Sequence, residues 1–188
     1  MSDDVHLLNE PFMLRNGAHA VLRAIRPNDR ARLQAAFLAL DAESVYSRYF
    51  SYKRELNEAD LDRLCNPDFH ERVVLVVTQQ TGAGEIIVGS GGYVMQPTTD
   101  GTRAAEVAFA VEEDVQGQGI SRKLLAVLTE IARADGIERF DAEVLTRNAA
   151  MLHVFEHSGL AVQRHPDEAG VVRLSLSLAS TSPGAASR

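Results

Sequence analysis

The feature that most constrains this chain is a glycine loop that leads directly into a long amphipathic helix. Gly117 and Gly119 stand between an apolar strand pattern over residues 104–111 and a helical pattern over residues 119–134. The apolar side chains of the helix recur at helical spacing and predict one buried stripe, made of Ile120, Leu124, Leu125, Val127, Leu128 and Ile131. In this context backbone N–H groups and the helix N-terminus can bind a phosphate.

The rest of the chain alternates between strand and helix patterns, which favours a mixed α/β domain. Phe12 to Arg15, Asn16-Gly17 and residues 18–25 predict a hairpin, because Asn-Gly supplies the positive φ angles of a tight turn. Residues 73–77 form a continuous apolar run, as expected of a strand covered on both faces. Further strands are expected over residues 85–95, 104–111, 140–145, 161–163 and 171–178, and helices over residues 30–40, 44–50, 58–65 and 149–158.

Length and composition narrow the class of protein. The 188 residues suit one domain, expected over residues 12–178, with a loose polar arm over residues 1–11 and a disordered tail over residues 179–188. The formal net charge is -7 and no basic stripe is present, which argues against nucleic acid and suits an amine substrate. No stretch approaches the roughly 20 apolar residues of a membrane span. Cys65 is the only cysteine and is expected to be a buried structural thiol in a reducing, cytoplasmic compartment.

Three interpretations of the glycine loop compete on the residues alone. A dinucleotide site requires Gly-x-Gly-x-x-Gly, but the third glycine position is Arg122 and the loop follows several strands. A mononucleotide P-loop requires Gly-Lys-Ser/Thr after a four-residue gap, which the chain lacks. A plain strand-to-helix turn, whose glycines only relieve strain, stays open on this evidence.

The residues around the loop resemble those of a known family. Gln116-Gly117-Gln118-Gly119-Ile120-Ser121 is similar to the Gln/Arg-x-x-Gly-x-Gly/Ala motif of the GNAT N-acetyltransferases. Ser121 stands where that motif usually has Gly or Ala, and its small side chain still permits close approach to phosphate. Downstream, Asn148-Ala149-Ala150-Met151-Leu152 and then Gly159-Leu160 resemble the second signature of the family. Several motifs in the expected order favour an acyl-CoA site over the other interpretations.

The resemblance extends upstream and implies a fold and a reaction. Residues 22–29 and 44–50 resemble the acetyltransferase domain of bacterial protein-lysine acetyltransferases, so the resemblance covers about residues 12–178. It implies the GNAT fold, an α/β architecture with a mixed, strongly twisted sheet flanked by helices on both faces. It also implies acetyl-CoA as co-substrate, no metal, and acetyl transfer to a primary amine, with a protein lysine as the leading acceptor. A small-molecule amine acceptor and a catalytically weak acyl-CoA-binding sensor stay open as alternatives, and no pattern indicates an oligomeric state.

Individual cofactor-binding positions follow from the same resemblance. They lie at the strand end, in the loop with the first helical turn, and on the second helix: Ala108, Phe109, Ala110, Val111, Gln116, Gly117, Gln118, Gly119, Ile120, Ser121, Arg122, Asn148, Met151 and Phe155. The family strand splays at a bulge just before the loop, where the backbone N–H of residue 108 or 109 can bind the thioester oxygen. Acceptor recognition is expected of Tyr46, Tyr49, the strand around Gly89–Gly92 and the C-terminal hairpin.

Glu106 is the candidate catalytic residue. It shares a strand face with Ala108 and Ala110, whose small side chains leave room for a substrate. Apolar neighbours would also make the carboxylate a stronger base. In the protein-lysine acetyltransferases that the chain resembles, the matching glutamate is the general base and acts through water.

Three other features lie near this expected site. Many relatives carry a tyrosine as general acid seven residues after the signature asparagine, but this chain has Phe155, which cannot donate a proton. Arg122 and Lys123 can either reach phosphates from the first helical turn or remain solvated. His153 and His157 match the His-x-x-Glu-His pattern of a class of zinc proteases, but no third ligand is evident, so a solvated pair is expected.

Overall fold

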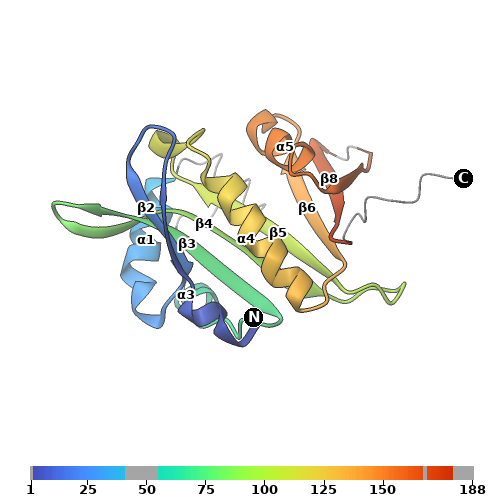
Figure 1. The fold of residues 1–188 in the computed structure, drawn as a ribbon, viewed down its shortest axis with the longest axis horizontal. Coiled ribbons are helices and arrows are strands. Elements are labelled where there is room, and N and C mark those ends of the chain that lie inside the picture. The colour runs from blue at the N-terminus through green and yellow to red at the C-terminus, as the bar shows by residue number, and fades with distance from the viewer. Residues whose placement is uncertain (1, 41–54, 167–168, 180–188) are drawn as a thin grey trace, which may run out of the picture.

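The computed structural model describes residues 2–40, 55–166 and 169–179 and contains one eight-stranded sheet (Figure 1). The strand order is β1-β2-β3-β4-β5-β6-β8-β7, and among these described strands only β5 and β6 are parallel neighbours. The strands are β1 Asn9–Met13, β2 His19–Ala24, β3 Arg72–Thr81, β4 Gly84–Gln96, β5 Ala104–Val111, β6 Arg139–Leu145, β7 Ala161–Arg164 and β8 Val171–Ser177. The mixed sheet predicted from the sequence is therefore confirmed.

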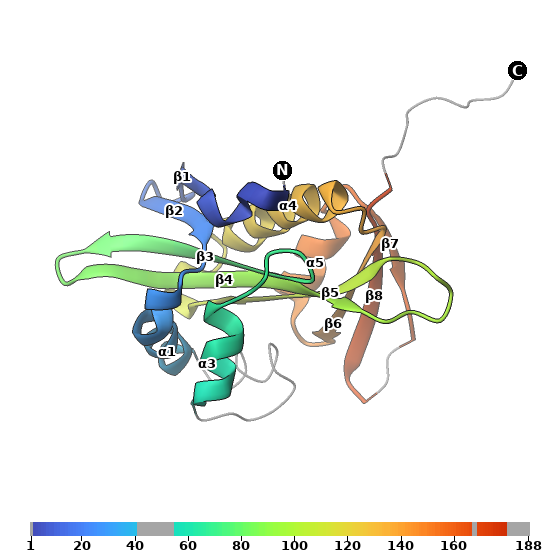
Figure 2. The same cartoon turned by 90° about the horizontal axis from the view of Figure 1, so that it is seen from below.

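Helices cover both faces of this sheet, as predicted (Figure 2). The α-helices are α1 Arg30–Ala39, α3 Glu58–Cys65, α4 Ile120–Ala134 and α5 Ala149–Glu156, with 3-10 turns η1 Ser2–Leu7, η2 Pro27–Asp29 and η3 Glu113–Val115. Helices α1 and α3 lie against one face, and α4 with η1 lies against the other. Within the described part of the chain, no helix is long and apolar enough to cross a membrane.

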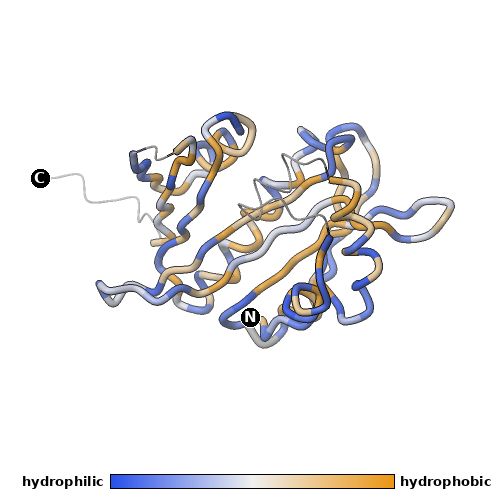
Figure 3. The backbone as a smooth tube through the Cα atoms, turned by 180° about the vertical axis from the view of Figure 1, so that it is seen from behind, coloured by the Kyte–Doolittle hydropathy of each residue, from blue (hydrophilic) through white to orange (hydrophobic). Residues whose placement is uncertain are grey.

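The central strand β3 carries the core on both of its faces. Val73, Leu75 and Val77 belong to the cluster under α4, whereas Val74 and Val76 belong to the cluster under α1 and α3. All five side chains are at most 7% exposed, which confirms the strand covered on both faces. Figure 3 shows the same concentration of hydrophobic residues along the long central strands.

The N-terminal segment differs from its prediction. Residues 1–11 were expected to form a loose arm, but η1 and β1 occupy this segment from Ser2 onward, and β1 pairs with β2. Val5 is 4% exposed and joins the core, with Leu8 packed beside it. The few apolar residues of the segment are enough to dock it, because the long α4 side of the sheet offers them a surface. The β1–β2 hairpin itself is confirmed, with Gly17 at φ 85° in its turn.

Several expectations fall outside the described residues. These are the helix over residues 44–50 with Tyr46 and Tyr49, and the disordered tail, of which only residue 179 is described. Cys65 at the end of α3 is inside the described part and is fully buried, as predicted. Burial and the nearby negative charge of Asp29 raise the pKa of this thiol, so it is a poor nucleophile.

Strands β5 and β6 separate soon after they meet. They pair at three positions, Ala104 with Arg139, Ala105 with Phe140 and Glu106 with Asp141. Beyond Glu106, β5 stays paired with β4 as far as Val111, whereas β6 pairs onward with β8. The expected splay is therefore present. The bulge expected on β5 is not, since the β4–β5 register is continuous over all of β5 and the irregularity lies between Val77 and Thr78 of β3.

Two glycines of β4 let other parts of the core approach closely. A Cβ on Gly91 would lie 2.6 Å from Phe109 Cδ1, and a Cβ on Gly89 would lie 2.8 Å from Ile120 Cγ2. Packing of the β5 phenylalanine and of α4 accounts for both positions. The acceptor-binding role expected of this strand is thus not needed to explain its glycines.

A buried ion pair fixes the corner where β2 leads into η2 and α1. Arg23 Nη1 and Nη2 donate to Asp29 Oδ2 and Oδ1 at 2.7 and 2.8 Å, and Arg23 Nε also donates to Glu85 at 3.2 Å. Arg23 is 1% exposed and Asp29 is fully buried. Burial alone would raise the pKa of Asp29, but the bonds from Arg23 and from the Arg26 N–H outweigh it and lower that pKa.

Replacement of Asp29 by alanine should lower the free energy of unfolding by about 3–5 kcal/mol, because Arg23 is left as an unpaired buried charge. Asp62→Ala is the control, since its exposed pair with Arg30 should contribute no more than about 1 kcal/mol. Because the folded-state pKa of Asp29 is lowered, its contribution is complete above pH of about 4 and is lost as the pH falls below it. Urea denaturation at pH 7 and at pH 3 measures both effects; equal losses in the two variants at pH 7 would refute this role.

Candidate active site

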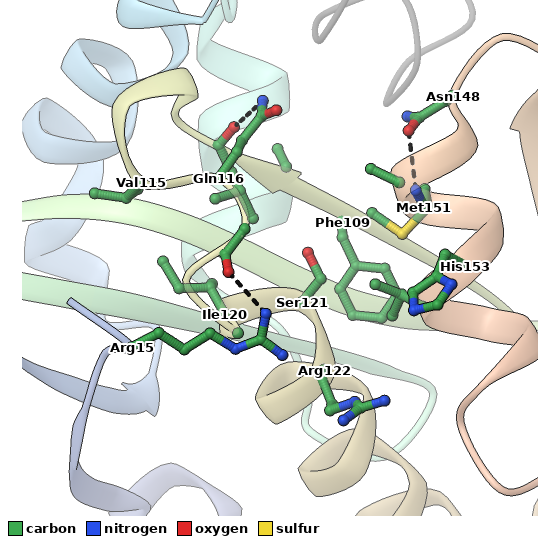
Figure 4. Close-up of a pocket in the computed structure, with 16 residues that line it drawn as sticks. Arg15, Phe109, Val115, Gln116, Ile120, Ser121, Arg122, Asn148, Met151 and His153 are labelled. Atoms are coloured by element: carbon green, nitrogen blue, oxygen red, sulfur yellow. Dashed lines mark hydrogen bonds between the residues drawn. The ribbon is translucent and has the colours of Figure 1, made fainter.

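A cavity of about 310 Å³ opens between the end of β5, the glycine loop and α5 (Figure 4). Most of the predicted cofactor-binding residues line it: Phe109, Ala110, Val111, Gln116, Gly117, Gly119, Ile120, Ser121, Arg122, Asn148 and Met151. Five lining residues were not predicted: Arg15, Val115, Ala150, His153 and Val154. Ala108, Gln118 and Phe155 were predicted but do not line this cavity. The structure thus brings together Arg15, residues 109–122 and residues 148–154, which are far apart in the sequence.

The loop owes its glycines to backbone conformation. Gly117 and Gly119 adopt φ angles of 73° and 93°, in the left-handed region that other residues rarely occupy. A Cβ on Gly117 would meet nothing within 4 Å, so neighbouring protein atoms do not require this glycine. Gly119 is the N-cap of α4 and has no side chain to satisfy the first N–H groups of the helix. Those N–H groups and the positive end of the helix dipole can receive an anion at the cavity.

Arg15 reaches this loop from the β1–β2 turn. Its Nη1 donates to the carbonyl oxygen of Gly117 at 3.1 Å, and its side chain lines the cavity together with Arg122 of the first α4 turn. The two arginines add positive charge to the helix N-terminus. Local sequence patterns gave no signal for Arg15, because 102 residues separate it from Gly117.

Two other side chains of the loop brace the structure. Gln118 Oε1 accepts the backbone N–H of Asn16 at 3.0 Å, so this side chain anchors the hairpin turn and does not line the cavity. Gln116 Nε2 donates to the carbonyl oxygen of Val111 at 3.2 Å and ties the loop back to β5. Lys123 is paired with Glu10 at 2.6 Å, which leaves Arg122 as the basic side chain of the first turn that reaches the cavity.

Beyond Glu106, one edge of β5 is no longer paired with β6 and is open. The backbone N–H of Glu112 donates to Val88 of β4 at 3.1 Å. Because successive residues of a strand direct their N–H groups to opposite sides, those of Phe109 and Val111 point toward the β6 side. The β5–β6 pairs end at Glu106, so the N–H groups of both Phe109 and Val111 lie past the last pair and beside the cavity. Of the two donors expected, residue 109 fits the geometry.

Aromatic rings and an asparagine shape the wall on the α5 side. The rings of Phe109 and Phe155 lie 5.8 Å apart at 54°, and Phe155 is 1% exposed. Phe155 therefore supports Phe109 from behind. Asn148 Oδ1 accepts the N–H of Met151 at 3.0 Å, which confirms the predicted helix cap, and its side chain also lines the cavity.

Glu106 lies on a different face of β5, beside a second cavity of about 250 Å³. Ala108 lines that cavity too, while Val107 and Phe109 are buried on the opposite face, as the alternation predicted. The apolar surroundings expected of Glu106 are not observed. Its side chain is exposed, and Gln96 Nε2 donates to its Oε2 at 2.5 Å. This polar neighbour escaped prediction because it comes from the opposite strand, across the β4–β5 turn.

The histidine pair on α5 has an ordinary explanation. The rings of His153 and His157 stack at 3.9 Å, and His157 Nδ1 lies 3.0 Å from the carbonyl oxygen of His153. Over the described ranges, no group of three or more His, Cys, Asp or Glu side chains is arranged to hold a metal ion. The stacked pair is therefore a feature of the helix surface at the mouth of the cavity.

Comparisons with known proteins agree with this geometry. The model of the acetyltransferase (GNAT) family matches residues 39–160. Acetyltransferase Pat of Mycolicibacterium smegmatis is 32% identical over 162 residues, which cover 86% of this chain and 46% of Pat, so the chain spans about half the length of that relative. The GNAT domain of S. lividans PAT superposes with a TM-score of 0.79 at 34% identity, covering 91% of this chain and 97% of that domain. The fold is also shared with Salmonella typhimurium yncA, solved with its cofactor acetyl-CoA, at a TM-score of 0.65 and 22% identity, over 88% and 98% of the two chains.

The conformation of the loop makes a prediction about stability. Gly119→Ala should cost about 1–2 kcal/mol, because an L-residue is strained in the left-handed region. Gly82→Ala is a matched control in the β3–β4 turn, where the φ angle is not left-handed and a Cβ would meet nothing within 4 Å. It should leave stability unchanged or raise it by up to about 1 kcal/mol. Thermal and urea denaturation compare the two variants, and a Gly119→Ala protein as stable as the parent would count against the constraint.

Proposed function

The chain belongs to the GNAT acetyltransferase family, and from this premise we propose that it moves the acetyl group of acetyl-CoA to a primary amine, the side chain of a protein lysine. The observation that carries the proposal is the cavity at the uncapped start of α4, beside the open edge of β5. The relative named acetyltransferase Pat favours a protein acceptor. The proposed acetyltransferase domain includes all eight strands of the sheet, from β1 to β8.

The cavity suits both ends of acetyl-CoA. The loop N–H groups, with Arg15 and Arg122, would hold the pyrophosphate, since a helix N-terminus and two cations favour a dianion. Val115, Met151 and Val154 supply apolar walls for the pantetheine arm. Ser121 adds a hydroxyl without bulk at the first turn. The open β5 edge offers backbone groups to the amides of the arm, as an added strand would.

The chemical step is attack of a neutral amine on the thioester carbonyl. A C–N bond forms, the C–S bond breaks, and the thiolate leaves with its electron pair, while one amine proton passes to a base. A lysine with a pKa of about 10.4 must lose a proton first, which costs roughly 4–5 kcal/mol at pH 7. Glu106 is the proposed base. Since it lies three residues from Phe109 along β5, the proton is proposed to travel through an intervening water, to which the exposed carboxylate has access.

The backbone N–H of Phe109 is proposed to stabilise the developing oxyanion. It lies on the open edge of β5, and the ring of Phe109 is fixed between Gly91 and Phe155. A donor that is held rigidly before the reaction stabilises the transition state without further reorganisation. The splay of β6 leaves this donor unpaired, and the close packing on Gly91 holds it in place.

The leaving thiolate is proposed to depart as the anion. Phe155 cannot protonate it. Within the described ranges the one tyrosine is Tyr93, which is 1% exposed and whose hydroxyl donates to Asp135 at 3.3 Å. Burial and the negative charge of Asp135 raise the pKa of Tyr93, so this hydroxyl is a poor acid. A thiol pKa of about 8.5 makes the free thiolate a tolerable leaving group near neutral pH.

Glu106→Gln should lower turnover by roughly a hundredfold or more, with little change in the affinity for acetyl-CoA, because the amide keeps the shape but cannot accept the proton. Glu143→Gln is the control, since this exposed carboxylate of β6 is paired with Arg173 at 3.3 Å and has no proposed role. Thiol release measured with lysine peptides gives turnover, and titration calorimetry gives affinity. Unchanged turnover in Glu106→Gln would remove Glu106 from this role.

The same thiol-release assay separates three hypotheses: a protein acceptor, a small-molecule acceptor and a sensor without turnover. Turnover with lysine peptides supports the proposed function. Turnover with polyamines, amino acids or amine drugs alone would assign a small-molecule acceptor. Binding of acetyl-CoA without turnover on any amine would instead assign a sensor.

A further inference from the structure

The cavity beside Glu106 is lined by an arginine that makes no ion pair and no side-chain hydrogen bond within the described part of the chain. Among the residues that the structure describes, three charged side chains line this cavity: Arg63 of α3, Arg72 of β3 and Glu106 of β5. Arg63 is already engaged, since its Nη2 lies 3.2 Å from Asp60 Oδ1. Arg72 is half-buried, and among the residues that the structure describes its guanidinium has neither an ion pair nor a hydrogen-bond partner.

Asp68, an acid close to Arg72 in sequence, interacts with the arginine through charge, which helps to lower the pKa of Asp68, but not through a side-chain hydrogen bond. Asp68 Oδ1 accepts the backbone N–H groups of His70, Glu71 and Arg72 at 2.8, 2.8 and 2.9 Å. These bonds close the turn before β3 and hold the carboxylate toward the backbone. The half-buried guanidinium of Arg72 therefore keeps its donors available for a partner that enters the cavity.

Arg72 and Glu106 point to the same side of the sheet. Arg72 pairs with Val94, and Val94 pairs with Glu106, so the three residues form one row across β3, β4 and β5. Residues in such a row share a face, and two strand spacings place the outer two about 10 Å apart at Cα. Val94 between them is 41% exposed and offers an apolar contact. The row therefore presents a cation, an apolar surface and the proposed base in succession.

We propose that the acceptor carries an acidic residue two positions from the target lysine, and that Arg72 binds its carboxylate while the lysine amine lies at Glu106. This inference rests on the proposed function. Residues two positions apart in an extended peptide are about 7 Å apart, which the lengths of the two side chains extend to the span of the row. An arginine binds a carboxylate through two parallel hydrogen bonds, which gives geometric specificity as well as energy.

Local charge outweighs net charge in this choice. The chain has a formal net charge of -7, which alone would favour basic acceptors. At physiological salt, charges on a protein surface are largely screened beyond about 8 Å. The charge in contact with the peptide therefore decides, and at the far end of the row that charge is Arg72.

The test uses three lysine peptides that are identical except at one position, two residues from the lysine. That position holds Glu, Ala or Lys. The parent protein should show a kcat/KM about five- to tenfold higher on the Glu peptide than on the Ala peptide, and added salt should reduce this preference. Arg72→Gln should abolish the preference and leave turnover of the Ala peptide near the parent value. Arg72→Glu should instead favour the Lys peptide.

Arg63→Gln is the matched control, because Asp60 already neutralises this arginine of the same cavity. It should keep the preference for the Glu peptide. Equal kcat/KM on the Glu and Ala peptides in the parent protein would overturn the inference and leave the proposed function intact. An equal loss of preference in the two arginine variants would overturn the assignment to Arg72. Failure of every peptide, with turnover on small amines, would refute the protein acceptor and this inference with it.

Discussion

The rest of the site depends on the early separation of two parallel strands. Strands β5 and β6 pair over Ala104 to Glu106 and then part, because β6 continues along β8 while β5 stays with β4. The separation exposes backbone groups in the middle of a sheet, where they would ordinarily be paired. An extended ligand with amide groups can satisfy them, so the sheet topology supplies the edge along which we propose that a pantetheine arm binds. Glycines in β4 then let Phe109 and α4 pack close enough to make the exposed edge rigid.

Charge is segregated between the two faces that meet at β5. Toward the glycine loop, the uncapped start of α4 is joined by Arg15 and Arg122, which suits the phosphates of the donor. On the other face lie Glu106 and Arg72, which suit an amine with a neighbouring carboxylate. In the proposed mechanism, the strand would separate donor from acceptor and bring both to one short segment, from Glu106 to Phe109. Under the proposed function, local geometry would let a chain with an acidic net charge bind an anionic cofactor.

Local periodicity predicted the elements that carry strong patterns of their own. The bounds of α3 and β5 and the apolar stripe of α4 follow from residues close together in the sequence. For the same reason, most of the side chains that were predicted near the loop do line one cavity, and their role in cofactor binding stays a proposal. What escaped prediction depends on distant contacts: Arg15 reaches Gly117 across 102 residues, Gln118 turns away to hold Asn16, and Gln96 meets Glu106 from the next strand. The packing of the N-terminal segment also escaped prediction, because Val5 is buried by contacts with parts of the core that are distant in the sequence.

The central claim is that acetyl-CoA binds at the start of α4 along the edge of β5, and amide hydrogen exchange measures this residue by residue. Addition of acetyl-CoA should slow exchange most at the N–H groups of residues 117–122, and also at Phe109 and Val111 on the open strand edge. Helix α3, on the other face of the sheet, should exchange at its former rate. Protection confined to α3 and the Glu106 cavity, with none at the glycine loop, would contradict the claim.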